Sequence, residues 1–401
     1  MVTDTTIKKG YKQTESGVIP EDWEVKKLRE VLYYEQPTKY LVNNAEYNDN
    51  NDTPVLTAGK TFILGYTNEV FGIFNSIPVI IFDDFTTANK FVTFPFKAKS
   101  SAMKMLMPTG EDVNLRFVYE KMQLIDFPLG DHKRYWISEY QNLEIEMPKP
   151  EEQTAIATVL SDTDALMERL EKLIAKKKAI KQGTMQQLLT GKKRLPGFSR
   201  EWAEKKLGEI GETYSGLSGK KKSDFDGGKY PYIPFMNIMS NPVIDLQYFD
   251  YVNIQGDEKQ NKAIKGDLFF NGSSETPEEV GMCSVLQGNI PNLYLNSFCF
   301  GFRLNKDLKT DGLYLSYFFR SPMGRQLIFS LAQGATRYNL SKTNFMKLEI
   351  PYPDPAEQTA IANVLIDMDA EIEKLESQLV KYQNIKQGMM QQLLIGKIRL
   401  L

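Results

Sequence analysis

The residue types that carry most enzyme chemistry are scarce in this sequence. The only histidine is His132, which excludes a histidine-based triad or a multi-histidine metal site within one chain. The two cysteines, Cys283 and Cys299, lack metal-site spacing, and we expect reduced thiols rather than a disulfide. Asp83 and Asp84 could pair as acids, but a turn after a buried strand explains them better. The sequence therefore predicts no catalytic residue and no metal site in this chain.

Two further motifs of DNA-modifying and nucleotide-driven enzymes are also missing. The segment GlyLeuSerGlyLysLysLysSer at 216–223 resembles a phosphate loop but lacks the spacing of a nucleotide site. The sequence also contains no Asp/Asn-Pro-Pro-aromatic tetrapeptide, which an amino-methylating DNA methyltransferase would require. We therefore discount this loop as a nucleotide site, and the missing tetrapeptide disfavours a catalytic DNA methyltransferase.

Several loops carry instead the residue types that contact DNA. The segments at 130–136 and 333–339 occupy matching places before two long helices, and both contain an Arg-Tyr pair. Arginine can bind guanine and asparagine can bind adenine through two hydrogen bonds each, whereas lysine and serine hold phosphates. The segments at 215–223 and 271–274 are small, polar and suited to phosphate or base contact. With three lysines of the first half, the candidate DNA-contacting residues are Lys60, Lys97, Lys99, His132, Lys133, Arg134, Tyr135, Ser215, Lys220, Lys221, Lys222, Asn271, Ser273, Thr336, Arg337, Tyr338 and Asn339.

Composition sets broad limits on the class of protein. The chain has 401 residues, 42% hydrophobic and 25% charged residues and a net charge of −2, which is ordinary for a globular protein with two or three domains. The longest apolar runs are too short to span a bilayer, and the polar N-terminal segment shows no secretory signal. We therefore expect a cytoplasmic protein. The acidic balance leaves DNA binding open, because local clusters of Lys and Arg decide it. Each basic cluster taken alone is better explained as a solvated surface.

One long segment occurs twice and must position these loops. Residues 152–195 align without gaps with residues 357–400, at an offset of about 205, and about 28 of 44 positions are identical. Shorter segments near Trp23 and Trp202 are also alike, so the duplication includes the beginning of each globular region. The chain reads as globular region, helix, globular region, helix.

Each repeated segment has the pattern of a long amphipathic helix. It begins after a proline-rich turn, and Glu152 and Glu357 suit the positive end of a helix dipole. Gly191 and Gly396 are placed to end the helices, and about 39 residues predict a rod of about 58 Å. Apolar residues recur at alternating steps of three and four, which indicates a coiled coil. The predicted seam consists of Ile156, Leu166, Leu170, Leu173, Ile180 and Leu188, with Ile361, Met368, Ile372, Leu375, Leu379, Ile385 and Leu393.

The simplest partner for each helix is the other one. We predict an antiparallel coiled coil, which would place the two globular domains at opposite ends in a pseudo-two-fold arrangement. The alternative is that each helix packs only on its own domain. Gly183 and Gly388 lie at the same place in both helices and cost about 1 kcal/mol relative to alanine. A close backbone approach, a bend or simple inheritance would each explain them.

The globular regions share a layout but not a sequence, which predicts an α+β fold duplicated and tuned to two targets. Duplication with neutral drift is the competing explanation, and it is weakened because the long helices have kept their sequence. Matching strand-like runs occur at 53–57 and 230–234, and matching helices at 115–124 and 313–320. The predicted boundaries are a first recognition domain at 1–148, with a flexible lead-in at 1–18, and a central helical repeat at 149–195. A second recognition domain at 196–350 and a distal helical repeat at 351–401 follow.

With its two repeated helical segments, the chain resembles the specificity subunits of type I restriction–modification systems. The resemblance rests on the segments at 148–160 and 353–365, which share a Pro-x-Pro element followed by Glu-Gln, and on the Gln-Gln-Leu-Leu-x-Gly-Lys endings of 181–195 and 386–400. It covers nearly the whole chain. The recognition domains of that family vary so much that no base-contacting residue can be transferred by motif.

The resemblance implies a non-catalytic subunit whose two target-recognition domains each read one half of a bipartite, asymmetric DNA site. The helix pair would set the spacing and dock two methyltransferase subunits, and two ATP-dependent restriction subunits would join for cleavage. S-adenosylmethionine, ATP and Mg²⁺ would belong to those partners, and no membrane would be involved. Three alternatives remain: a coiled-coil scaffold without DNA specificity, a catalytic DNA methyltransferase, which the missing motif disfavours, and an orphan paralogue that has lost its partners.

Overall fold

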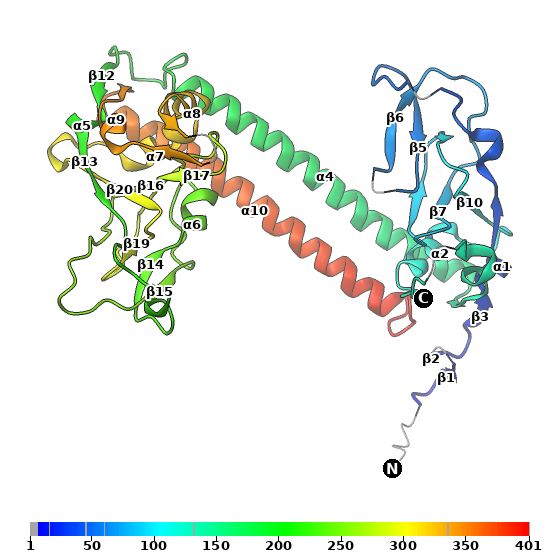
Figure 1. Cartoon of the computed structure of the whole chain (residues 1–401). Coiled ribbons are helices and arrows are strands. Elements are labelled where there is room, and N and C mark those ends of the chain that lie inside the picture. The colour runs from blue at the N-terminus through cyan, green and yellow to red at the C-terminus, as the bar shows by residue number, and fades with distance from the viewer. Residues whose placement is uncertain are drawn as a thin grey trace. The chain divides into compact units, whose positions relative to one another are not determined.

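A computed structural model describes residues 7–15, 17–44, 46–59, 61–130, 133–334 and 337–400. Their contacts divide the chain into two compact units (Figure 1). Unit 1 combines Met1–Leu170 with Gln378–Leu401, and unit 2 is Glu171–Ser377. Each unit therefore contains one mixed α and β domain and parts of two long helices. Within the described ranges, no helix is both long and apolar enough to cross a membrane.

Unit 1 is built on a four-stranded antiparallel sheet with the strand order β4-β10-β7-β8. A second sheet, β6-β5-β9, pairs β5 with β6 antiparallel and with β9 parallel. All five residues of β7 are buried because the strand runs through the middle of the domain. The elements are β1 Tyr11–Thr14, β2 Gly17–Pro20, β3 Glu24–Lys27, α1 Leu28–Val31, β4 Leu32–Glu35, η1 Pro37–Tyr40, β5 Thr53–Leu56, β6 Ile63–Thr67, β7 Val79–Asp83, β8 Asn89–Val92, β9 Lys97–Ala98, β10 Met103–Pro108, α2 Leu115–Met122, α3 Tyr135–Ser138, η2 Tyr140–Asn142 and β11 Glu144–Met147.

Unit 2 repeats this frame strand by strand. Its four-stranded sheet has the order β13-β20-β16-β18, and its β15-β14-β19 sheet again contains one antiparallel and one parallel pair. A three-stranded sheet, β17-β22-β21, is an additional feature of this unit. The elements are β12 Ala203–Lys206, α5 Leu207–Ile210, β13 Gly211–Ser215, η3 Lys222–Asp224, β14 Tyr230–Ile233, α6 Phe235–Ser240, β15 Asp250–Val252, β16 Leu268–Asn271, β17 Ser273–Ser274, β18 Cys283–Val285, β19 Tyr294–Leu295, β20 Cys299–Leu304, η4 Lys306–Leu308, α7 Gly312–Arg320, α8 Pro322–Phe329, β21 Ala332–Gln333, β22 Tyr338–Leu340, α9 Lys342–Met346 and β23 Glu349–Tyr352.

Residues 7–15 and 17–18 of the predicted N-terminal lead-in are described by the structure. From Tyr11 the chain forms the β1–β2 hairpin, in which Tyr11 pairs with Pro20. The Tyr11 hydroxyl also donates a hydrogen bond of 3.0 Å to the carbonyl of Gly396. The described part of the predicted lead-in therefore contains a strand pair and a long-range contact.

The two long helices are α4, Pro150–Leu188, and α10, Pro355–Leu393, and each has 39 residues. They pack together in antiparallel fashion (Figure 1). In unit 1, Asp164 of α4 pairs with Lys386 of α10 at 2.7 Å. In unit 2, Lys181 of α4 pairs with Asp369 of α10. Since Lys181 and Lys386 are equivalent in the repeat, as are Asp164 and Asp369, the same ion pair occurs once in each unit. The predicted antiparallel helix pair is confirmed.

The alternative packing mode is also partly present, because the helix ends join the domain cores. In unit 1, Ile156 and Leu160 of α4 and Leu393 of α10 belong to one buried cluster. In unit 2, Ile361 of α10 and Leu188 of α4 belong to the corresponding cluster. Each domain core is therefore closed by both helices.

The predicted seam needs correction at four positions. Leu166, Leu173, Ile180 and Ile385 are between 37% and 47% exposed, so they lie outside the buried face. Leu170 and Ile372 are buried as predicted, and Met368, Leu375 and Leu379 are half-buried. Part of the space between the helices is taken by the Asp–Lys pairs and by a Lys177–Glu371 pair of 2.7 Å. An apolar heptad count could not anticipate a face that polar side chains share.

A matching junction holds the first turn of each long helix. In unit 1 the buried Glu152 accepts hydrogen bonds from the Trp23 indole at 3.1 Å and from Arg399 at 2.6 and 2.7 Å. In unit 2 the buried Glu357 accepts hydrogen bonds from the Trp202 indole at 2.9 Å and from Arg194 at 2.6 Å through both oxygens. The repeated Trp, Glu and Arg therefore make the same three-residue contact twice.

Candidate DNA interface

Two of the predicted DNA-contacting loops form one edge of unit 2. Strand β17 of the 271–274 segment pairs antiparallel with β22, so that Ser273 lies opposite Asn339. The N–H of Leu340 also donates a 2.9 Å hydrogen bond to the carbonyl of Gly272. Arg337 and Asn339 are exposed there and Ser273 is half-buried. Segments separated by more than sixty residues thus present an arginine, an asparagine and a serine side by side, while Thr336 lies outside the described residues.

A third predicted loop joins this edge through Ser215 at the end of β13. The ammonium group of Lys342 donates a 2.7 Å hydrogen bond to the Ser215 hydroxyl. The side-chain amide of Asn261 donates to the Ser215 carbonyl at 3.0 Å. Desolvation lowers the pKa of Lys342 from its ordinary value. Through its contact with Ser215, Lys342 adds to this edge a lysine that could reach a phosphate, although no sequence motif had indicated it.

An exposed phenylalanine, also missed by the motif search, lies within the same cluster. The Phe298 ring is 57% exposed, and the guanidinium carbon of Arg337 lies 5.7 Å from its centroid. Its backbone is held tightly: the carbonyl accepts from the N–H of Gly272 at 2.8 Å, and its N–H donates to the Asn296 side chain at 2.8 Å. The available sequence signal was a large apolar residue directly after the polar pair Asn296-Ser297. We name Ser215, Ser273, Phe298, Arg337, Asn339 and Lys342 the unit 2 tip.

Other predicted residues of unit 2 have structural contacts. Asn271 is fully buried and its amide binds the carbonyl of Glu279 and the N–H of Met282. The Lys220 side chain is only 4% exposed and lies 2.5 Å from Glu258, which corrects its assignment as a free phosphate-binding group. Lys221 and Lys222 are exposed, and Tyr338 is half-buried.

The matching loop of unit 1 is anchored in a different way. Asp84, directly after β7, accepts hydrogen bonds of 2.8 Å from the N–H of Tyr135 through its carbonyl and from the N–H of Trp136 through its carboxylate. The carboxylate also pairs at 3.1 Å with the buried Lys104. Asp83 accepts from the N–H of Phe85 at 2.9 Å, so the turn interpretation of the two acids is confirmed.

This anchor divides the candidates of unit 1 into buried and exposed groups. Tyr135 is 2% exposed and packs within the core, which removes its ring from any surface. Lys133 and Arg134 remain exposed, and Lys133 pairs with Glu139. His132 and Lys60 lie outside the described residues. Among the described candidates of this loop, Lys133 and Arg134 therefore keep a surface position.

Among the remaining lysines, Lys97 is an interior residue and Lys99 a surface residue. Lys97 is 1% exposed, lies 2.8 Å from Glu69 and donates to the carbonyl of Phe71 at 2.8 Å. Desolvation opposes ionisation of Glu69, but hydrogen bonds from Lys97 and from the N–H groups of Asn44 and Asn43 outweigh it and lower the pKa. Lys97 therefore closes a loop inside the domain, whereas Lys99 is exposed, with its ammonium group 5.9 Å from the centroid of the Tyr47 ring.

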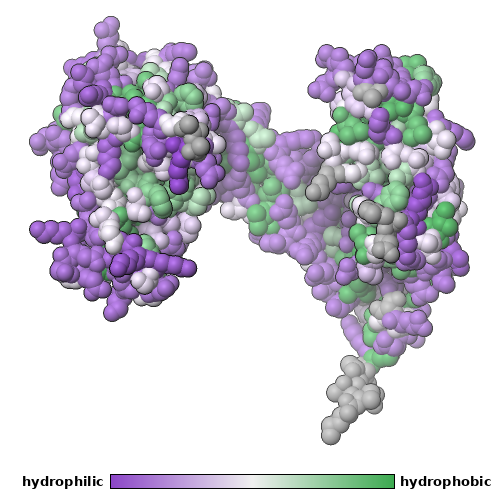
Figure 2. Space-filling view, viewed as in Figure 1, coloured by the Kyte–Doolittle hydropathy of each residue, from purple (hydrophilic) through white to green (hydrophobic). Residues whose placement is uncertain are grey.

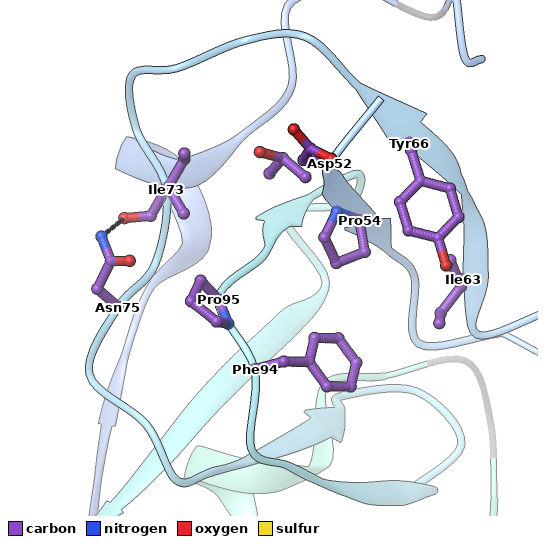
Figure 3. A pocket seen from close by; sticks show the side chains of 9 residues that line it. Asp52, Pro54, Ile63, Tyr66, Ile73, Asn75, Phe94 and Pro95 are labelled. Atoms are coloured by element: carbon purple, nitrogen blue, oxygen red, sulfur yellow. Dashed lines mark hydrogen bonds between the residues drawn. The ribbon is translucent and has the colours of Figure 1, made fainter. Parts of the chain in front are cut away.

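A shallow hollow of about 410 Å³ opens on the second sheet of unit 1 (Figure 3). Pro54, Ile63, Phe94 and Pro95 give it an apolar lining, and Tyr66 and Asp52 add polar groups. The side-chain amide of Asn75 is used by the carbonyl of Ile73 at 3.0 Å. Figure 2 shows that hydrophobic residues gather in separate patches on an otherwise mostly hydrophilic face. The hollow suits contact with an apolar group and offers no pair of groups for acid–base chemistry.

The described residues provide little for catalysis. No group of three or more His, Cys, Asp or Glu among them is arranged to hold a metal ion. Cys283 and Cys299 are buried free thiols. Desolvation raises the pKa of Cys299 to about 12 and raises that of Cys283 as well, so neither is a nucleophile at neutral pH.

Comparison with known proteins identifies the relatives of this chain. The model of the type I restriction modification DNA specificity domain matches residues 20–182 and again residues 199–382. The chain is 33% identical over 361 residues to the specificity subunit of the type I restriction enzyme EcoR124I/EcoR124II of Escherichia coli, covering 85% of each chain. It is 24% identical over 429 residues to the type I restriction enzyme MjaVIII specificity subunit of Methanocaldococcus jannaschii, covering 97% and 96%. Its fold is similar to the crystal structure of a type I S subunit from M. genitalium, with a TM-score of 0.61, 16% identity and coverage of 92% and 96%.

Proposed function

Because the chain belongs to the type I restriction–modification DNA specificity family, we propose that each of its recognition domains binds one half of a bipartite, asymmetric DNA site. The observation that carries this proposal is that the same strand order occurs twice, with different side chains in the predicted DNA-contacting loops. We call the surface formed by these loops in each domain its reading edge. Unit 2 presents Arg337, Asn339 and Phe298 there, whereas unit 1 presents Lys133 and Arg134. Two different surfaces on one frame suit two different half-sites.

We further propose that the helix pair fixes the distance between the half-sites and docks two methyltransferase subunits, with two restriction subunits joining for cleavage. The spacer role is supported by the length of α4 and α10, which have 39 residues each, and by the ion pairs between them. A rise of 1.5 Å per residue makes each helix about 58 Å long. The methyl donor, ATP and Mg²⁺ would be held by the partner subunits, and the complex would act in the cytoplasm. The domain boundaries at 148, 195 and 350 remain part of this proposal.

The first experiment identifies the site and tests the reading edge. Methylated adenines are mapped in cells with and without this chain, and the complex with its methyltransferase subunits is then assayed on the resulting duplex. Arg337→Ala should weaken binding by about 5- to 150-fold and relax specificity at one base pair, because a bidentate arginine–guanine contact contributes about 1–3 kcal/mol. Arg134→Ala should do the same in the other half-site.

A matched control is Lys306→Ala, because Lys306 is exposed in the same domain but lies beyond the opposite end of β20. It should leave affinity and specificity unchanged. Unchanged specificity in both arginine variants would contradict these two base contacts. A complex without any sequence preference would contradict the proposed function and favour a scaffold.

The second experiment tests the helices as a spacer. Deletion of residues 170–176 together with 374–380 removes two turns from each helix but keeps the Asp164–Lys386 and Lys181–Asp369 pairs. The helices shorten by about 10 Å, so the spacer in the methylated site should shorten by about 3 base pairs. An unaltered spacer in the methylation map would overturn this role.

A further inference from the structure

We propose that Phe298 is a specificity-determining residue of the second recognition domain and packs against the 5-methyl group of a thymine in the major groove. This inference rests on the proposed DNA-reading function. Sequence motifs did not select the residue; its exposure and its neighbours in the unit 2 tip do.

The first argument is that Phe298 lies outside the core although its neighbours lie inside it. Phe300 and Phe302 of β20 are 1% and 0% exposed, and both rings pack within a buried aromatic cluster. Phe298 precedes the same strand and is 57% exposed. Its ring therefore adds little to the stability of the domain and remains accessible to a binding partner.

The second argument is that the backbone of Phe298 is fixed while its ring is exposed. Its N–H and its carbonyl are both used, by Asn296 and by Gly272. A Cβ on Gly272 would lie 3.1 Å from the Phe298 carbonyl oxygen, so glycine permits this close approach. A rigid support is what base reading requires, because contact geometry must be held to within fractions of an ångström.

The third argument is the chemistry of the surrounding side chains. Arg337 lies beside the ring, and the neighbouring Asn339 lies opposite Ser273. Arginine reads guanine and asparagine reads adenine through hydrogen bonds, whereas the thymine methyl is read by apolar contact, for which phenylalanine is suited. The phenylalanine therefore supplies the one contact type that the polar members of the tip lack.

Unit 1 provides a natural contrast. The position before its equivalent strand β10 is Ala102, which follows Ser100 and Ser101 and is half-buried. No aromatic ring projects from that position, so the contact is specific to the second domain. Two half-sites that differ in base composition are consistent with such a difference.

The test removes the methyl group from the DNA and the ring from the protein. The thymines of the mapped site are replaced one at a time by deoxyuridine, and binding is measured with the complex of this chain and its methyltransferase subunits. One replacement should weaken binding of the unaltered complex about fourfold, the effect of one buried methyl group. With Phe298→Ala that replacement should have no effect, and Phe298→Leu should restore part of it.

Tyr251→Ala is the matched control, since Tyr251 is 53% exposed on β15 of the other sheet. It should keep the full deoxyuridine effect. Phe298→Ala should also keep its thermal unfolding midpoint, because the ring is exposed.

Three results of the thymine replacements would overturn the proposal: a half-site that contains no thymine, no replacement that weakens binding, or a replacement that still weakens binding by the Phe298→Ala complex. A uniform loss of affinity with increased 2-aminopurine fluorescence would also overturn it and indicate a wedge between base steps. In each of these cases the complex would still prefer its site, whereas loss of all preference by the unaltered complex would contradict the proposed function itself.

Discussion

The junctions of the long helices and the reading edges of the domains differ in how far the two units agree. At the junctions, Glu152 and Glu357 accept the same hydrogen bonds from a tryptophan and an arginine. At the edges, unit 1 fixes its loop through Asp84, whereas unit 2 builds the extra β17-β22-β21 sheet. The duplication has therefore kept a supporting contact atom for atom and replaced the surface that it supports.

A third region lies between these extremes. The first turns of α2 and α7 are held alike, because Gln153 and Gln358 accept hydrogen bonds from the N–H groups of Asn114 and Asp311. Farther along, α2 presents Glu120 toward the long helices where α7 presents Tyr317. Equivalent positions of the two helices thus contact the long helices through a carboxylate in unit 1 and through a phenol in unit 2.

The largest expected effect tests the equivalence of the junctions. Arg399→Ala and Arg194→Ala should each lower the free energy of unfolding by about 2–4 kcal/mol, because each leaves a buried glutamate without its cation. Hydrogen bonding to Glu357 raises the pKa of Arg194, and hydrogen bonding to Glu152 raises that of Arg399. Denaturant unfolding measures both variants, and Arg29→Ala serves as an exposed control. Destabilisation by only one of them would break the comparison.

A smaller effect tests the position where the units diverge. Glu120 is fully buried, 2.6 Å from Arg116 and 3.6 Å from Lys386, so Glu120→Gln should cost about 2 kcal/mol. Tyr317 donates to Asp369 at 2.7 Å, and Tyr317→Phe should cost about 1 kcal/mol because Lys181 still pairs with that carboxylate. Chemical denaturation of the two variants gives the difference. Equal costs would show that the carboxylate and the phenol are interchangeable supports.

The smallest effect concerns the glycines inside the long helices. A Cβ at Gly183 or Gly388 would meet nothing within 4 Å, so neither a close approach nor a steric limit within the chain explains them. Gly183→Ala and Gly388→Ala should each raise stability by up to about 1 kcal/mol, measured as a higher unfolding midpoint. Assembly with the methyltransferase subunits is the companion measurement. Normal assembly would favour inheritance from the ancestral repeat, and its loss would indicate a partner backbone at these positions.

Local pattern was a reliable guide wherever neighbouring residues decide the structure. The proline-rich starts at Pro150 and Pro355, the helix length and the matching strands of the two domains follow from spacing and turn residues along the chain. The lysines show the opposite case. Lys97 is drawn inward by Glu69, and Lys220 by Glu258, through contacts that no local window contains.

The seam and the reading edge needed the fold for the same reason. Leu166 and Leu173 fit a heptad, yet the interhelical face contains Asp164 and Lys181. Phe298 is a large apolar residue of the kind that usually lies in the core. It is exposed here because it lies just before the first residue of β20.

By itself the sequence determined the duplication, the two long helices, the mixed domain class and the resemblance to DNA specificity subunits. These properties are repeated or periodic along the chain, so they can be recognised without contacts. Only the tertiary structure decided which cations are free, which helix faces meet and which side chains gather at the unit 2 tip. Those outcomes depend on burial and on pairs far apart in sequence, where desolvation of a charge or exposure of a ring is set by the whole domain.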